Sequence, residues 1–260
     1  MRRNRQTKEG FVAASVDLPP SRSARLPRSR AALLCLGVAL AAVGCGGDTG
    51  TSDTGGQPPP ATAAPAAATP SAPAAACHSP APGSPASLHF TTEPPLTVDT
   101  HASYTAVLNT NCGAITLSLL TAQAPHTVNS FAFLAGQKYF DHSPCHRLTT
   151  AGIFVLQCGD PTGTGTGGPG YTIPDENLSG ATYAAGTVAM ANTGQAHTGG
   201  SQFFLVYRDT QLPPSYTPFA KVTAGLDILQ QTAARGTTNG GPDGAPRSPV
   251  VIDSVSVTKA

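Results

Sequence analysis

The stretch that decides the fold is "CHRLTTAGIFVLQCGDPTGTGTGG", from Cys145 to Gly168. Two runs within it, 145–150 and 153–159, have the composition of short β-strands. A run of glycine, threonine and proline follows the second. Such a run cradles phosphate where it leads into the N-terminus of a helix. Here no Lys follows the glycines, and Pro169 and Pro174 interrupt any following helix, so we interpret the run as a tightly turning surface loop.

Six further runs outside this stretch predict strands, which gives many short strands in all. They are Tyr104–Thr110, Ala114–Leu120, Gly186–Asn192, Ser201–Tyr207, Phe219–Val222 and Val250–Thr258. The first two flank "NCG", a hairpin signal. Short strands combined with two separated helices favour an antiparallel barrel with the helices over its ends.

Two segments predict these helices. The first, 124–137, has Pro125 in its first turn, and its apolar face is formed by Val128, Phe131, Leu134 and Ala135. The second, 223–236, has Thr223 as its predicted N-cap and Gly236 to end it. Its apolar face is formed by Leu226, Leu229 and Ala233. Both faces have the spacing of a helix that packs on a core.

The N-terminal residues have the pattern of an export signal. Eight of the 15 Lys and Arg residues fall in the first 30 positions, and an apolar run, 31–43, follows them. This run is shorter than the roughly 20 apolar residues that span a membrane. "AVGC", ending at Cys45, resembles a bacterial lipobox, so we expect residues 1–44 to be a lipoprotein signal peptide and Cys45 to carry the lipid. Cleavage without lipidation and an uncleaved N-terminal anchor are the alternatives.

Residues 45–87 consist mostly of Ala, Pro, Gly, Ser and Thr and predict a disordered tether. Residues 88–260 then form one domain. We expect it to be held by the lipid at the outer face of the cytoplasmic membrane, in the cell envelope. Without residues 1–44, seven Lys and Arg stand against twelve Asp and Glu, so the net charge is about −5. No basic face is left for nucleic acid.

Metal and hydrolase chemistry are both weakly supported. The residues available to a metal are His142, Cys145, His146 and Cys158. Cys145 and His146 are adjacent, so on a strand they point to opposite faces, and C-x-x-C is missing, so we predict no metal site. Ser201, with His126, His146 or His197, could form a hydrolase site, but Phe203 replaces the last glycine of a nucleophile elbow. Exported thiols can pair, and across the hairpin we favour Cys145 with Cys158.

Three stretches together resemble the cyclophilin family of peptidyl-prolyl cis/trans isomerases. They are the opening stretch, "GTVAMANTGQAHTGGSQFFLVY" (186–207) and "YTPFAKV" (216–222). The resemblance lies in the order of His-Arg, Phe, Gln-x-Gly-Asp, a glycine loop, Met-Ala-Asn and Gly-Ser-Gln-Phe-Phe, and it runs from about Tyr104 to the C-terminus. It implies a closed eight-stranded antiparallel β-barrel capped by two α-helices, in which the glycine loop borders the substrate groove.

The resemblance also implies a role for each matched residue. Arg147 matches the catalytic arginine, and Gln157 matches the glutamine that helps orient it. The matched substrate-binding positions, besides Gln157, are Phe154, Val155, Gly165, Ala191, Asn192, Thr193, Gln202, Phe204, Leu212 and Tyr216. The opening stretch has two extra residues within "TTAGI", so its hairpin turn differs. Leu212 stands where many members have Trp, and Tyr216 where many have His; both still supply apolar wall.

These residues predict an enzyme that accelerates rotation about X–Pro bonds in exported proteins. Arg147 would donate a hydrogen bond to the proline nitrogen, with no covalent step and no cofactor. The expected partners are proline-containing segments of unfolded or exported proteins and, through the lipid, the membrane; we expect a monomer. The alternative is a proline-peptide-binding module or chaperone with little turnover, motivated by Leu212 and Tyr216. For Arg147 alone, the alternative is a structural ion pair with Asp160.

Overall fold

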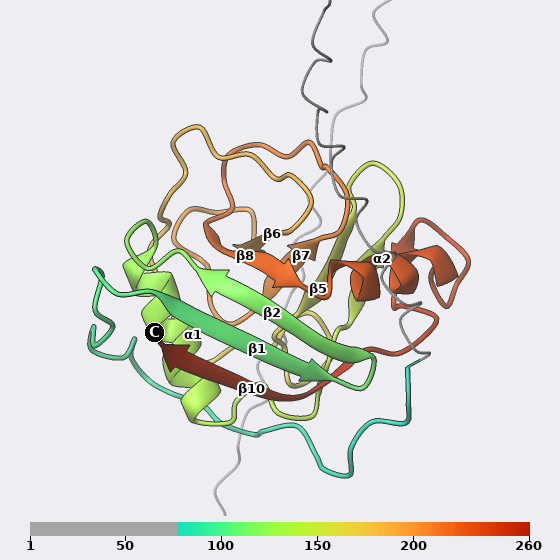
Figure 1. The fold of residues 1–260 in the computed structure, drawn as a ribbon, viewed down its shortest axis with the longest axis horizontal. Helices are drawn as coiled ribbons and strands as arrows, with labels where there is room; N and C mark the ends of the chain where they lie inside the picture. The colour runs from blue at the N-terminus through green and yellow to red at the C-terminus, as the bar shows by residue number, and fades with distance from the viewer. Residues whose placement is uncertain (1–76) are drawn as a thin grey trace, which may run out of the picture. The chain divides into compact units, whose positions relative to one another are not determined.

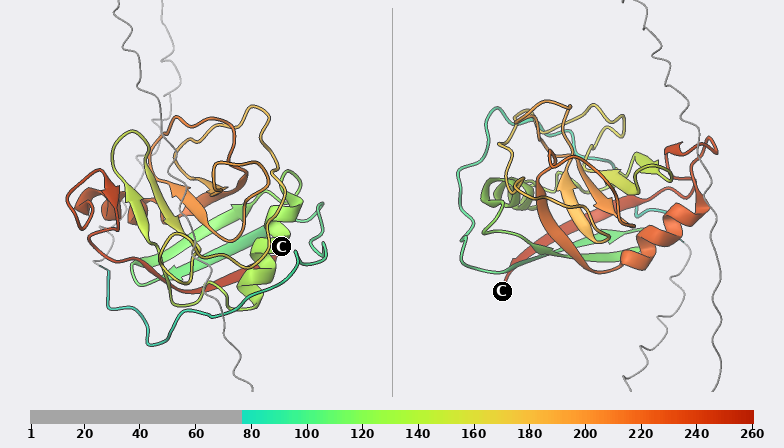
Figure 2. Two further views of the ribbon diagram at one scale, coloured as in Figure 1. Left: turned by 180° about the vertical axis from the view of Figure 1, so that it is seen from behind. Right: turned by 90° about the horizontal axis from the view of Figure 1, so that it is seen from above.

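A computed structural model of the chain describes residues 77–260. One antiparallel sheet of ten strands curls around an apolar core, and two helices lie at its opposite ends (Figures 1 and 2). The strands are β1 (Tyr104–Thr110), β2 (Gly113–Leu119), β3 (Ser143–Pro144), β4 (Arg147–Thr149), β5 (Val155–Cys158), β6 (Thr187–Met190), β7 (Phe203–Val206), β8 (Pro218–Ala224), β9 (Asp243–Gly244) and β10 (Val251–Lys259). The helices are α1 (Pro125–Gly136) and α2 (Leu226–Arg235). Neither of these two helices has the length and hydropathy to cross a membrane.

The predicted class, mainly β and antiparallel with two helices, is confirmed. Eight strands of three or more residues correspond to the eight predicted runs, and two-residue strands, β3 and β9, raise the count to ten. The hydrogen-bonded order is β3-β10-β1-β2-β8-β6-β7-β5-β4-β9. Among the described strands no pairing joins β3 to β9, so the sheet curls without the continuous ladder of a closed barrel. Such short end strands offer few backbone groups for a further ladder.

Helix α1 covers one end of the core, as its periodicity predicts. Its four predicted apolar residues are all buried. The ring of Phe131 packs on Phe140 and Phe203, with centroid distances of 5.2 and 5.6 Å. The first N–H groups of the helix, which lack partners within the helix, are satisfied from a distant loop: the carboxylate of Glu176 accepts the N–H groups of His126 and Thr127 at 3.0 and 2.8 Å.

Helix α2 begins differently from the prediction. Thr223 lies in β8 and does not cap the helix; Gly225, with φ of 87°, precedes it instead. A β-carbon at position 225 would lie 2.6 Å from the carbonyl oxygen of Ala114, so the close approach of β2 excludes every side chain there. The predicted end at Gly236 is confirmed, and Leu229 is fully buried.

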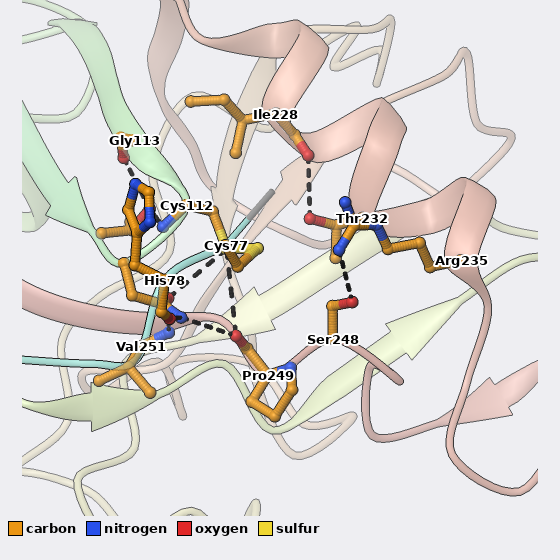
Figure 3. Close-up of a disulfide and its surroundings, with 12 residues drawn as sticks. Cys77, His78, Cys112, Gly113, Ile228, Thr232, Arg235, Ser248, Pro249 and Val251 are labelled. Atoms are coloured by element: carbon orange, nitrogen blue, oxygen red, sulfur yellow. Dashed lines mark hydrogen bonds between the residues drawn. A yellow bond between two sulfur atoms is a disulfide. The ribbon is translucent and has the colours of Figure 1, made fainter. Parts of the chain in front are cut away.

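The residues before β1 are joined to the domain. A disulfide links Cys77 to Cys112, in the turn between β1 and β2 (Figure 3). Beside it, the N–H of His78 donates to the carbonyl oxygen of Asn111 at 2.8 Å. The N–H of Val251 donates to the side-chain oxygen of Asn111, also at 2.8 Å. Cys77 and His78, which composition assigned to the tether, are therefore bonded to the domain. The predicted signal peptide and residues 45–76 of the predicted tether lie outside the described residues.

The sheet has apolar side chains on both faces around β5, β6 and β7. Successive residues of a strand point to opposite faces, so Leu156, Val188 and Leu205 enter the main core. Neighbouring strand residues point to the other face, where Tyr183 from the segment before β6 joins them. The resulting second, smaller cluster consists of Val155, Tyr183, Ala189, Phe204 and Val206. This smaller cluster supports the floor of the candidate site.

After β5 the glycine-rich run wraps around the carboxylate of Asp160, whose exposed fraction is 0%. The carboxylate accepts N–H groups from Thr162, Gly165 and Gly167 at 2.8, 2.7 and 3.1 Å. Burial raises the pKa of Asp160, but the hydrogen bonds from Thr162, Gly167 and Gly165 together hold it below its usual value. The inward N–H groups of the run therefore bind this internal anion, which removes the phosphate-cradle interpretation.

These contacts predict how stability depends on pH. A carboxylate with a lowered pKa in the folded state stabilises the fold above its unfolded pKa, near 4, and that contribution is lost as pH falls further. Asp160→Asn should therefore lower the free energy of unfolding at pH 7 by about 1–3 kcal/mol and flatten its decline below pH 4. Urea unfolding at several pH values measures both. Asp209→Asn, an exposed carboxylate with one backbone partner, is the matched control; parallel curves for wild type and Asp160→Asn would contradict the assignment.

Candidate active site

Two hollows adjoin on the face of the sheet that carries the smaller cluster. The smaller hollow has a volume of about 160 Å³ and is lined by Arg147, Ile153, Val155, Gln157, Ala191, Asn192, Phe204, Leu212 and Tyr216. The larger, of about 810 Å³, is lined by Gln157 and by parts of the segments 165–172, 191–193 and 198–202. Gln157, Ala191 and Asn192 line both, so an extended ligand could occupy both at once.

All but one of the predicted site residues line one of these hollows, and Phe154 is the exception. Its ring packs instead on Tyr207, at 6.0 Å between centroids, and the guanidinium carbon of Arg208 lies 3.4 Å from the centre of its ring. Alternation explains the difference, because Ile153 and Val155 share the face of Gln157 and Phe154 points the other way. Ile153, which the sequence analysis missed, supplies the apolar contact expected of Phe154.

Strand register aligns the central residues of the site. Arg147 of β4 pairs with Gln157 of β5, Gln157 pairs with Phe204 of β7, and Phe204 pairs with Ala189 of β6. Directly opposed residues in antiparallel strands have side chains on the same face. The sheet therefore presents a cation, an amide and an aromatic ring in one row across three neighbouring strands.

The guanidinium of Arg147 is held from two sides. Its Nε and Nη2 donate to the two carboxylate oxygens of Asp243 at 2.9 and 2.7 Å, and its Nη1 donates to Oε1 of Gln157 at 3.3 Å. An arginine has five N–H donors, so within the described part of the chain one N–H on each Nη is left for a ligand. The alternative pairing with Asp160 does not occur, because that carboxylate is enclosed by the glycine loop.

Arg147 and Asp243 reinforce each other's charge. The hydrogen bonds that Arg147 donates to the carboxylate of Asp243 raise the pKa of Arg147, with partial burial acting in the opposite direction. The hydrogen bond from Arg147 likewise lowers the pKa of Asp243. The side chains remain 39% and 52% exposed, so solvent screens the pair. Arg147 is thus a permanent donor at any working pH.

The apolar side of the smaller hollow is built from aromatic rings. The rings of Phe204 and Tyr216 meet edge to face, with centroids 5.4 Å apart. Tyr183, buried behind them, donates its hydroxyl to the carbonyl oxygen of Tyr216 at 2.8 Å and accepts the N–H of Tyr216 at 3.0 Å. This locks the loop that carries Tyr216. Tyr183 lies outside every motif quoted above, so nothing in the sequence identified its role.

The polar side of the site continues from Gln157 into the glycine loop. The side-chain amide of Gln157 donates to Oε1 of Gln202 at 2.9 Å. The amide of Gln202 in turn donates to the carbonyl oxygens of Gly165 and Gly167 at 2.9 and 2.8 Å. Gly165 has φ of 83°, a conformation that favours glycine. One line of hydrogen bonds therefore connects Arg147 to the loop around Asp160.

The segment 191–193 forms the opposite wall. The side-chain amide of Asn192 donates to the carbonyl oxygen of Ser215 at 2.8 Å, which joins this wall to the loop before Tyr216. The N–H of Ala191 donates to the carbonyl oxygen of Gln202 at 2.9 Å. Thr193 donates its N–H to the hydroxyl of Thr198 at 3.1 Å. The backbone here is therefore held in place before any ligand arrives.

The alternative chemistries find no matching geometry. Ser201 is 2% exposed and donates its hydroxyl to the carbonyl oxygen of Gly159 at 2.7 Å, not to a histidine. Cys145 and Cys158, the pair that the sequence favoured, are joined in a disulfide, so neither is available as a thiolate ligand. Across residues 77–260 no cluster of three or more His, Cys, Asp and Glu side chains could hold a metal ion.

Comparison with known proteins identifies the family. The family model described as "Cyclophilin type peptidyl-prolyl cis-trans isomerase/CLD" matches residues 105–257. A probable peptidyl-prolyl cis-trans isomerase B of Mycobacterium leprae is 48% identical over 168 residues, which cover 59% of this chain and 57% of that protein. Peptidyl-prolyl cis-trans isomerase B of Bacillus subtilis is 43% identical over 118 residues, covering 45% of this chain and 80% of that protein.

Solved structures of a cyclophilin type isomerase also align with this chain. A crystal structure of a cyclophilin type peptidyl-prolyl cis-trans isomerase of Cryptosporidium parvum aligns with a TM-score of 0.54 and 27% identity, over 60% of this chain and 98% of that chain. A second crystal structure of that protein, in the presence of the dipeptide Ala-Pro, aligns with a TM-score of 0.53. The chain spans only about half the length of the mycobacterial relatives it matches. With a family model that covers most of the described residues, the chain belongs to the cyclophilin type peptidyl-prolyl cis-trans isomerase family.

Proposed function

We propose that this protein accelerates cis/trans rotation about X–Pro peptide bonds. The observation that carries the proposal is the position of Arg147, which keeps two N–H groups unused among residues 77–260 and lines a hollow of about 160 Å³ with one apolar side. A pyrrolidine ring is compact and apolar, and it could pack on the apolar side of this hollow, which Val155, Phe204 and Leu212 help to form. The residues flanking the proline would extend into the larger hollow, which shares Gln157, Ala191 and Asn192 with the smaller one.

Rotation about an X–Pro bond can be accelerated by one correctly placed hydrogen-bond donor. Rotation about the peptide bond is opposed by about 18–20 kcal/mol because it breaks amide resonance. In the twisted transition state the proline nitrogen regains a lone pair that the planar amide lacks. A donor aimed at that nitrogen binds the twisted form more tightly than the planar one, and binding of that kind accelerates the reaction. A free N–H of Arg147 would supply this bond in a groove whose apolar wall limits water.

The remaining residues would hold the substrate in register. Val155, Phe204 and Tyr216 would seat the proline ring, and the ring is thereby kept still while the preceding carbonyl turns. Gln157 would keep the guanidinium oriented through its bond to Nη1. No group in this scheme forms a covalent bond with the substrate or exchanges a proton with it. The rate should accordingly vary little across neutral pH.

The second candidate is a module that binds proline segments with little turnover. It is favoured by Leu212 and Tyr216, which change the apolar wall relative to many members of the family. Exchange spectroscopy by NMR on a proline peptide separates the two, because a binding module shifts the peptide resonances without increasing the exchange rate between isomers.

The site of action that we propose is the cell envelope, with the protein exported and held at the outer face of the cytoplasmic membrane by lipid on Cys45. The lipobox-like residues 42–45 and the preceding basic and apolar runs support this. The two disulfides are compatible with an oxidising compartment. Proline-containing segments of exported proteins would then be the substrates, and the protein would act as a monomer.

The proposal predicts the effect of removing the donor. Arg147→Ala should lower kcat/KM on a proline peptide by roughly 10- to 100-fold, because it deletes a charge-assisted hydrogen bond of about 1.5–3 kcal/mol. Arg147→Lys, which keeps the charge and loses the planar fork, should fall between. Arg235→Ala, on α2 and bonded to Ser248, is the matched control and should match wild type. Unchanged turnover in Arg147→Ala would refute the mechanism.

The anchor makes a separate prediction. In a lipidating bacterial host, the wild-type chain should sediment with membranes, and Cys45→Ser should not, because the thiol that receives the lipid is lost. Cys35→Ser, a cysteine within the apolar run, is the control and should still sediment. Fractionation with detection of the protein in each fraction measures this. Membrane retention of Cys45→Ser would exclude the lipid anchor without affecting the enzymatic proposal.

A further inference from the structure

We infer that Asp243 is a positioning residue for Arg147, an inference that rests on the proposed isomerase function. The two residues are 96 positions apart in the chain and meet through β9. This two-residue strand pairs with β4, with Asp243 opposite Thr149 and Gly244 opposite Leu148. Asp243 is therefore a diagonal neighbour of Arg147 across the strand pair, within reach of a long side chain.

The contact fixes the plane of the guanidinium. Both carboxylate oxygens of Asp243 are used, one on Nε and one on Nη2. A bidentate contact of this kind sets the orientation of the planar fork as well as its position. The contact from Gln157 is single and longer, at 3.3 Å. Asp243 therefore dominates the orientation of the two N–H groups that remain for substrate.

Asp243 holds Arg147 without occupying the site. It is absent from the residues that line the smaller hollow, whereas Arg147 is among them. The carboxylate therefore binds the guanidinium from beside the hollow and leaves the hollow free for the proline ring. A carboxylate inside the hollow would instead compete with the substrate for the same donors.

The loop that presents Asp243 is itself well held. The side-chain amide of Asn239 donates to the carbonyl oxygen of Asp243 at 3.1 Å, and the hydroxyl of Thr237 donates to Oδ1 of Asn239 at 2.8 Å. Thr237 is buried. On the other side, the N–H of Thr150 donates to the carbonyl oxygen of Pro242 at 2.8 Å. These bonds tie the loop to itself and to the end of β4, so Asp243 is a fixed point and not a chance surface partner.

The solvent exposure of Arg147 and Asp243 distinguishes a positioning role for Asp243 from a role in stabilising the fold. Arg147 and Asp243 are 39% and 52% exposed, and exposed ion pairs contribute little to folding. The chain contains a matched pair remote from the site: Lys259 and Asp99, 2.9 Å apart and 53% and 46% exposed. If Asp243 acts by positioning, its loss should lower the rate of isomerisation. The melting temperature should change no more than it does when the Lys259–Asp99 pair is broken.

The test compares Asp243→Asn, Asp243→Glu and the control Asp99→Asn in the full chain. Asp243→Asn should lower kcat by about tenfold, within the range caused by a misplaced reacting group, with KM and the melting temperature close to those of wild type. Asp243→Glu keeps the carboxylate and should recover part of the loss. Asp99→Asn should behave as wild type. A rate for Asp243→Asn equal to that of wild type would overturn the inference while leaving Arg147→Ala to decide the proposed function.

Two further measurements isolate the action through Arg147. In an Arg147→Ala background, Asp243→Asn should change the rate by less than about twofold, since no donor remains to be positioned; an independent loss as large as in wild type would overturn the inference. In ¹⁵N-arginine-labelled protein, the Nε–H resonance of Arg147 should be protected and should shift or vanish in Asp243→Asn. If the wild-type chain lacks turnover, the proposed function fails, and this resonance alone decides: an unchanged signal in Asp243→Asn overturns the positioning role.

Discussion

A fully buried carboxylate is the constraint on which the site depends. Asp160 is ionised away from solvent, and a buried charge without partners is strongly destabilising. The glycine-rich run meets this requirement by turning its N–H groups inward. Once the run is wrapped in this way, its carbonyl oxygens at Gly165 and Gly167 face Gln202. The orientation of the polar side of the site thus originates in an interaction outside both hollows.

The same sheet both folds the domain and presents the site. Strand alternation sends one set of apolar residues into the main core and the other into the smaller cluster under the site. Because β4, β5 and β7 are paired in register, Arg147, Gln157 and Phe204 lie in one row. The donor and the apolar seat are therefore kept together by backbone hydrogen bonds, and the loops mainly adjust what surrounds them.

Much of the fold could be predicted because burial on one face imposes a local spacing. That spacing identified both helices, whereas the eight longer strands were identified mainly by the composition of short β-like runs. Phe154 was assigned to the wrong face because counting from a motif gives chain position but not side-chain direction. Thr223 failed as a cap because a neighbouring backbone, invisible in the local sequence, demands glycine at 225.

The contacts that could not be predicted from the sequence join residues far apart in the chain. Asp243 lies in a two-residue strand, too short to show any periodicity, and meets Arg147 only after the sheet has formed. Glu176 and Tyr183 likewise act on elements far away in the chain. Cys77 sits in residues whose composition resembles a linker, and composition carries no information on which thiol a cysteine will meet.

The bond between Cys77 and Cys112 also determines how the domain would respond to mechanical tension. It closes a covalent loop that contains β1 and the segment before it. The covalent path of a pull on the chain ahead of Cys77 would run through the two sulfur atoms to Cys112, just before β2, and would bypass the backbone inside the loop. While the disulfide is intact, the backbone of β1, which pairs with both β2 and β10, would thus not be drawn out by such a pull.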